Sequence, residues 1–194
     1  THGGQSMFIT NTGPRDRRPV ERRDDVLVFT TSILEDAVEI TGPIELTMFA
    51  ASDAPDTDFT AALVDVHPNG KAIHICDGIV RARFRESYTH PTLIEPGTVY
   101  GYTFKLWETS NLFKAGHHIR LEISSSNFPR FDRNLNTGGP IHKEAVGQVA
   151  QALITPEAMV VANIDEGDWS SAMGKSKYNS AMAALSNDRG FSVY

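Results

Sequence analysis

Cysteine is almost absent from this chain, since Cys76 is the only one among 194 residues. A single thiol excludes an internal disulfide framework and leaves the compartment open, with the cytoplasm slightly favoured. No apolar run approaches the ~20 residues of a membrane-spanning helix, and no segment has a signal-peptide pattern. Acidic residues outnumber basic ones, 24 to 18, and the net charge of −6 argues against nucleic acids or anionic membranes as partners.

The length is that of one domain, or of one domain with an appendage. Residues 1–25 are rich in glycine, proline and charge, and predict an extended lead-in that crosses a surface. The arginines of this segment alternate with acidic residues, which is typical of a solvated face. Residues 26–164 carry the strand patterns. Residues 165–194 form a tail of small residues, with a possible helix at 180–185.

The chain is organised around a predicted hairpin between Asp56 and Glu86. Its arms, Phe59–Val66 and Ala72–Phe84, are rich in β-branched and aromatic residues. The sequence His67-Pro68-Asn69-Gly70 between them is typical of a tight turn. In the second arm the apolar residues shift from odd to even positions, which predicts a β-bulge at Asp77-Gly78.

Apolar alternation predicts several further strands, at 26–31, 38–50, 98–108, 117–125 and 158–164. We expect the strands at 98–108 and 117–125 to pair with each other. The only helical pattern before the tail covers Glu144 to Leu153. Many short strands with frequent turns indicate an all-β sandwich, with Greek-key or jelly-roll connections.

Catalytic patterns are weak. The G-x-S-x-G sequence of an α/β-hydrolase nucleophile does not occur, and Ser124-Ser125-Ser126 lacks the flanking glycines. Thr1 raises the alternative of an N-terminal nucleophile, but that chemistry usually sits in a sandwich flanked by helices. We therefore interpret Thr1 as a truncation point and expect no catalytic residue in this chain.

Metal sites are not expected either. Asp53, Asp56 and Asp58 resemble an oxygen-ligand cluster for structural calcium, or they pair with nearby arginines and cap turns. His117 and His118 are adjacent in a predicted strand and therefore point to opposite faces, which prevents joint chelation of zinc. We expect no cofactor.

Arginines and phenylalanines mark a possible contact surface. Arg81, Arg83 and Arg85 alternate along the predicted second arm, either as a salt-bridged sheet face or as an interdomain contact. The polar loop 126–139 carries Phe128 and Phe131, which we expect to dock on another surface.

Several segments resemble the C-terminal domain of the X-Pro dipeptidyl-peptidase and cocaine-esterase family. They are GPRDRRPVERRDDVLVFTT, ITGPIELTMFAAS, SDAPDTDFTAALVDVHPNGKAIHICDGIVRARFRES and ISSSNFPRFDRNLNTGG, and the likeness covers roughly residues 3 to 144. The resemblance implies a jelly-roll, galactose-binding-like sandwich that is not catalytic. In the family it follows an α/β-hydrolase domain with a Ser-Asp-His triad, and that domain is missing here. The family's last strand has only a loose counterpart at 156–161.

The resulting hypothesis is an accessory domain that packs on a serine hydrolase and shapes its active site. The expected interdomain contacts lie in two places. In the second hairpin arm they are Arg81 and Arg83, and in the polar loop they are Phe128, Arg130, Phe131 and Asp132. One alternative is a carbohydrate-binding module, although Trp107 alternates away from Tyr100 and Tyr102 and the three make no single platform. Another is a structural protein that self-associates into a homo-oligomer through the tail 165–194.

Overall fold

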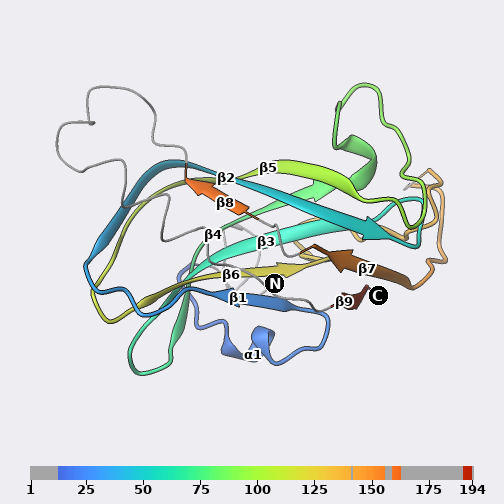
Figure 1. Cartoon of the computed structure of the whole chain (residues 1–194). Coiled ribbons are helices and arrows are strands. Elements are labelled where there is room, and N and C mark those ends of the chain that lie inside the picture. The colour runs from blue at the N-terminus through green and yellow to red at the C-terminus, as the bar shows by residue number, and fades with distance from the viewer. Residues whose placement is uncertain (1–12, 141, 156–158, 163–189, 194) are drawn as a thin grey trace.

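The computed structural model of the chain describes residues 13–140, 142–155, 159–162 and 190–193. The described residues are almost entirely β (Figure 1). The elements are a short helix α1 (Arg18–Glu21), strands β1 (Leu27–Thr30), β2 (Val38–Ser52), β3 (Asp58–Val66) and β4 (Ala72–Arg81), a 3₁₀ turn (Ala82–Phe84), and strands β5 (Tyr100–Phe113), β6 (His118–Ser124), β7 (Ala150–Ile154), β8 (Met159–Ala162) and β9 (Gly190–Val193). No helix among the described residues has the length and apolar character needed to cross a membrane.

Two antiparallel sheets make a sandwich, which confirms the predicted fold class. One sheet has the order β1-β6-β3-β4, and the other has the order β5-β2-β7-β9 with β8 also paired to β2. Successive strands therefore cross repeatedly from one sheet to the other, as in Greek-key sandwiches. The prediction that the strands at 98–108 and 117–125 pair is wrong, because β5 pairs with β2 whereas β6 pairs with β1 and β3.

The core lies between the sheets and follows the alternation of the sequence. In β2, Leu46 and Met48 are fully buried, and in β6 Leu121 and Ile123 are buried in the same way. Phe59 of β3 meets Tyr102 of β5 across the sandwich, with ring centroids 4.8 Å apart. Such interdigitation of the two inner faces is what holds a sandwich together.

The β3–β4 hairpin is present, but its irregularity lies elsewhere than expected. Leu63 is opposite Cys76 and Val64 is opposite His74, so Ile75 is the extra residue and the bulge lies there rather than at Asp77-Gly78. Gly78 has a different role: a methyl group on its Cα would lie 2.1 Å from the carbonyl oxygen of Lys105 in β5. The glycine therefore permits a close approach between the two sheets.

Two other local predictions are wrong. The segment 144–153 is not a helix, because residues 144–149 form a loop and Ala150–Ile154 is strand β7, paired with the end of β2. The second hairpin arm ends at Arg81, and Ala82–Phe84 forms a 3₁₀ turn. The arginines that follow therefore do not alternate along one strand face. The predicted helix at 180–185 lies outside the described residues, while β8 falls within the strand expected at 158–164.

The lead-in crosses a sheet surface as predicted, and Arg15, Arg18, Arg22 and Arg23 are exposed as expected, whereas Arg17 is not. Its backbone runs beside β4, with the Arg17 N–H donating to the carbonyl of Ala72 and the His74 N–H donating to the carbonyl of Arg15. Arg17 is largely buried and its guanidinium donates two hydrogen bonds to Glu122 Oε2, at 2.8 and 2.6 Å. The segment thus covers an edge and the outer face of the β1-β6-β3-β4 sheet. Of the tail beyond residue 164, Gly190–Val193 pairs with β7 of the same chain.

Candidate functional site

One end of the sandwich collects three loops, two of which are the longest loops among the described residues. The loops after β2, β4 and β6 all lie at the end where β3 begins (Figure 1). They are joined to one another, since the Ile94 N–H donates to the carbonyl of Pro55 and Arg83 donates to the carbonyl of Gly139. We call this region, comprising residues 53–57, 82–99 and 125–149, the loop end. It contains most of the predicted contact residues.

Two buried aspartates, Asp58 and Asp56, form ion pairs with two of the predicted contact residues. Asp58 and Arg81 are opposite each other in the β3–β4 register, and Arg81 donates to both carboxylate oxygens, at 2.7 and 2.9 Å. Arg83 donates from Nε to Asp56 at 2.7 Å. The Asn134 side chain, from the loop after β6, donates to both aspartates at 2.8 Å. The expected pairing of these carboxylates with arginines is confirmed.

A third arginine clamps the loop after β6 to β4. Arg130 donates to both oxygens of the buried Asp77, at 2.5 Å. The amide of Asn127 donates to the same carboxylate at 2.7 Å. Asp77 is therefore a site residue that the sequence analysis missed. The two loop residues that bond to it lie 50 and 53 positions away in the sequence, and no local pattern connects them.

The structure divides the six predicted contact residues into two groups. Arg81, Arg83 and Arg130 face inward onto aspartates and are nearly buried, and Phe131 is half-buried with the Arg130 guanidinium 5.1 Å from its ring. Phe128 is 49% exposed and the Asp132 side chain is 69% exposed. The arginines thus hold the loop, and Phe128 and Asp132 are the accessible members.

Further apolar side chains are exposed on the same loops. Tyr88 is 82% exposed and Val146 is 80% exposed, and Leu93 is about half exposed. Phe128 also borders a groove of about 540 Å³ between the lead-in and the loop after β6, whose floor includes Glu122. Exposed apolar side chains on a rigid frame, next to charged groups, are the composition of a protein contact surface.

Burial perturbs the charged groups below this surface. Burial raises the pKa of Asp58, while the hydrogen bonds from Arg81 oppose that shift, and the same ion pair raises the pKa of Arg81. Burial raises the pKa of Glu122 to about 7, against the opposing effect of Arg17. Burial lowers the pKa of His74 to about 4. The loop end and its groove therefore rest on charges that water reaches poorly.

Ser124 and the three aspartates considered for catalysis and ligand binding are bonded to other protein groups. The hydroxyl of Ser124 bonds to the hydroxyl of Thr60 at 2.7 Å rather than to a base. Asp53 accepts a hydrogen bond from the Gln151 N–H, and its neighbours Asp56 and Asp58 carry the arginines described above. These contacts account for all three carboxylates of the acidic loop.

Tyr100, Tyr102 and Trp107 of β5 do not form a shared platform either. Tyr102 is fully buried and Tyr100 lies under the guanidinium of Arg85, 4.4 Å from its ring centroid. Trp107 is exposed, at a position where β5 has one more residue than β2 and the Trp107 φ angle is +73°. This arrangement agrees with the alternation read from the sequence.

At the opposite end of the sandwich, two imidazoles meet a carboxylate. Asp65, His67 and His117 form the one group in the described part of the chain with the spacing of metal ligands. The sequence analysis missed it because His117 lies 52 positions from Asp65. The signal that was available is Asp65-x-His67, two potential ligands on one face of a strand end. His118 points away, with its Nδ1 bonded to the carbonyl of Thr31, as predicted.

Comparison with known proteins is consistent with the fold. Residues 4–159 match the family described as the X-Pro dipeptidyl-peptidase C-terminal non-catalytic domain. The chain is 50% identical over 152 residues to the cocaine esterase of Rhodococcus sp. (strain MB1 Bresler), covering 78% of this chain and 26% of that protein.

Solved structures give the same result. An α-amino acid ester hydrolase superposes with a TM-score of 0.69 and 29% identity, over 72% of this chain and 25% of that one. An aminopeptidase from a marine sediment Thaumarchaeota archaeon superposes with a TM-score of 0.65 and 30% identity, over 67% of this chain and 23% of that one. The chain therefore spans about a quarter of the length of these relatives. It belongs to the family of X-Pro dipeptidyl-peptidase C-terminal non-catalytic domains.

Proposed function

We propose that this domain is the accessory β-sandwich of a serine hydrolase and that it packs on the catalytic α/β-hydrolase domain through the loop end. The catalytic domain belongs to the same chain or to a separate one, and it hydrolyses esters or peptides. Family membership supports the accessory role, and the relatives named above are hydrolases several times longer than this chain. The role of the sandwich is to cover apolar hydrolase surface and to help shape the active site.

The observation that carries the docking surface is the exposure of Phe128 on a loop fixed from below. The loop is clamped by Arg130 on Asp77 and by Asn134 on Asp56 and Asp58. A surface that is rigid before binding loses less conformational entropy when it docks. Phe128 and its neighbour Arg133, whose guanidinium lies 4.8 Å from the ring, then have the character of an aromatic and arginine anchor.

A domain exchange tests this proposal. The corresponding C-terminal part of the Rhodococcus cocaine esterase is replaced by this chain, and ester hydrolysis and thermal unfolding of the chimera are measured. We expect an active chimera, because the two sequences are 50% identical over the exchanged region. Phe128→Ala in the chimera is then expected to lower Tm and activity together, since truncation of an aromatic anchor costs ~2 kcal/mol of docking energy.

The matched control is Ile33→Ala. Ile33 is 60% exposed, and it lies between β1 and β2, away from the loop end. This variant is expected to leave the chimera unchanged, and both substitutions are expected to leave the isolated chain as stable as before. A chimera in which Phe128→Ala and Ile33→Ala behave alike argues against docking through the loop end. An isolated chain that hydrolyses esters by itself contradicts the accessory role.

A further inference from the structure

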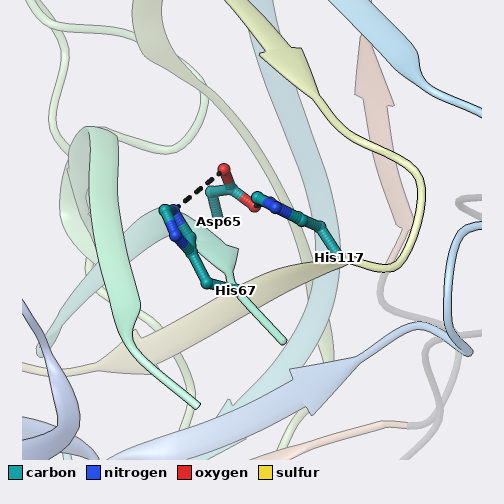
Figure 2. A group of neighbouring side chains, drawn as sticks. All are labelled: Asp65, His67 and His117. Atoms are coloured by element: carbon teal, nitrogen blue, oxygen red, sulfur yellow. Dashed lines mark hydrogen bonds and ion pairs between the residues drawn. The ribbon is translucent and has the colours of Figure 1, made fainter. Parts of the chain in front are cut away.

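Two turns meet at the end of the sandwich opposite the loop end. One joins β3 to β4 and the other joins β5 to β6. They lie against each other, since a methyl group on Gly116 would be 3.7 Å from Cγ of Pro68. Figure 2 shows the side chains of Asp65, His67 and His117 directed toward a common point. We call these three side chains the histidine–aspartate cluster.

The distances in the cluster are those of ligands around one ion. His117 Nδ1 is 2.8 Å from Asp65 Oδ1, and His67 Nε2 is 3.5 Å from Asp65 Oδ2. One ligand atom from each residue can be chosen so that all three lie within 4.8 Å of one another. Tetrahedral zinc with bonds of about 2.0–2.1 Å separates its ligand atoms by about 3.3–3.4 Å. Small side-chain rotations therefore suffice to bring the three atoms onto one ion.

The backbone positions of the ligands are fixed. Asp65 lies within β3, paired with Ile119 of β6. The His67 N–H donates to the carbonyl of Lys71, and the His67 carbonyl accepts from Gly70, which closes the turn. The His117 N–H donates to Lys114 and its carbonyl accepts from Leu34. A site whose ligands are held in this way needs little reorganisation on binding.

The cluster also combines a shielded interior with an entry path. The side chains of Asp65 and His117 are nearly buried, whereas that of His67 is 36% exposed. A hydrated ion can therefore approach from the His67 side and keep one or more water ligands there. The imidazole rings of His67 and His117 are 4.5 Å apart between centroids, with the single carboxylate facing both. A cation bound to one nitrogen of each ring and to the carboxylate would join all three groups.

We propose that Asp65, His67 and His117 bind a divalent first-row transition metal ion, with zinc as the representative ion. Two borderline imidazoles with one carboxylate suit zinc, cobalt and nickel, while calcium and magnesium prefer all-oxygen sites. Binding requires the ligand nitrogens free of protons, so the proton on His117 Nδ1 moves to Nε2 of the same ring, or to water if Nε2 already carries one, and the hydrogen bond to Asp65 is exchanged for two bonds to the metal. The ion ties the β3–β4 turn to the β5–β6 turn.

The test uses the complete chain, stripped of metal by a chelator and titrated with zinc in competition with a chromophoric indicator. We expect one zinc ion bound at the cluster, with affinity reduced at least about tenfold by His67→Gln. The matched control is His90→Gln, because His90 is exposed and bonds to Thr89 outside the cluster. That variant is expected to bind as the unaltered chain does.

Two further measurements separate binding from a change in folding. Before zinc is added, the unaltered chain and His67→Gln are expected to unfold at similar temperatures, because His67 is partly exposed. Zinc at about a hundredfold excess over Kd is expected to raise Tm of the unaltered chain by about 5 °C or more, and not that of the variant. Calcium and magnesium are expected to leave both unchanged.

Two outcomes overturn the proposal. Equal zinc affinity in the unaltered chain and in His67→Gln places the ion on other side chains. The absence of any zinc binding, or of any zinc effect on Tm, reduces the cluster to a hydrogen-bonded Asp–His pair that only supports the turns.

Discussion

Arg81 contacts two carboxylates, one buried and one exposed. Comparing substitutions of the two carboxylates tests which contact holds the loop end. Asp58 is nearly inaccessible and accepts two hydrogen bonds from Arg81, at 2.7 and 2.9 Å. Asp132 is 3.6 Å from the same guanidinium but is 69% exposed. The arginine itself is only 13% exposed. One cation therefore has both a buried partner and a surface partner.

Asp58→Asn removes the buried charge and leaves the Arg81 guanidinium with only its exposed partner, Asp132. Loss of one member of a buried pair costs about 3–5 kcal/mol, and the residual exposure of Arg81 places the expected loss of unfolding free energy near 3 kcal/mol. Asp132→Asn is expected to cost less than ~1 kcal/mol, because exposed pairs are screened by water. Urea unfolding of the full chain at pH 7, followed by tryptophan fluorescence, measures both values.

A second substitution isolates the ion pair from other effects of Asp58→Asn. In a double-mutant cycle with Arg81→Met, we expect a coupling of about 2 kcal/mol, since removing both charges relieves the unpaired guanidinium. Equal costs for Asp58→Asn and Asp132→Asn would refute the reasoning, because burial would then have no influence on the pair. A coupling near zero would show that Asp58 acts through packing or through Asn134 instead.

Two further predictions follow from the core and from the groove. Gly78→Ala is expected to lower the unfolding free energy by at least ~2 kcal/mol, because its methyl group would lie 2.1 Å from the Lys105 carbonyl oxygen. Urea unfolding measures this loss, and a value below ~0.5 kcal/mol would contradict the close approach of the two sheets. The pKa of Glu122 is raised from 4.5 to about 7. Between these pH values the folded state keeps a proton that the unfolded state has released. The stability that this proton contributes is therefore fully present below pH 4.5 and is lost as the pH rises through 7. The pKa of His74 is lowered from 6.5 to about 4, which opposes this trend below pH 6.5, so the test compares the unaltered chain with Glu122→Gln. Relative to the variant, the unaltered chain is expected to lose roughly 2–3 kcal/mol of unfolding free energy between pH 5 and pH 8. A difference in unfolding free energy that stays constant with pH would contradict the raised pKa of Glu122.

Strand positions were predictable where the signal is local. The alternation of β2 and β6 reports which side chains face the core, and it needs no knowledge of the partner strand. The turn at His67–Gly70 likewise fixes the β3–β4 hairpin, and its register places Asp58 opposite Arg81. The fold class and one of the site's ion pairs could therefore be derived from the sequence.

Predictions failed where distant partners decide. The alanine-rich segment at 144–153 has good helix propensity, yet its end pairs with β2 and buries Ala150, Ala152 and Ile154 on one face. The phase change in β4 was assigned to Asp77-Gly78, because nothing nearby reveals that Gly78 meets Lys105 of β5. Arg17 was interpreted as solvated because its partner, Glu122, lies 105 positions later. Tertiary packing overrode local propensity in each case.

Three arginine–aspartate pairs lie at or next to the loop end: Arg81–Asp58, Arg83–Asp56 and Arg130–Asp77. They share one arrangement, which explains why buried charge is found in a non-catalytic domain. Each includes a residue of β4 or of the turn that follows it, and each reaches the loop after β6: Arg130 bonds to Asp77, Arg81 lies near Asp132, and Arg83 donates to the carbonyl of Gly139. Buried pairs are weak sources of net stability, but they fix geometry.

A loop held by polar contacts does not need to bury its own aromatic side chains. Phe128 is 49% exposed on this clamped loop, as a docking residue needs to be. Stability and docking should then separate by residue: changes at Phe128 affect docking alone, and changes at Asp77 or Asp58 affect both. Under the proposed function, the sandwich supplies the frame, the ion pairs hold the loop, and the exposed ring would provide the contact.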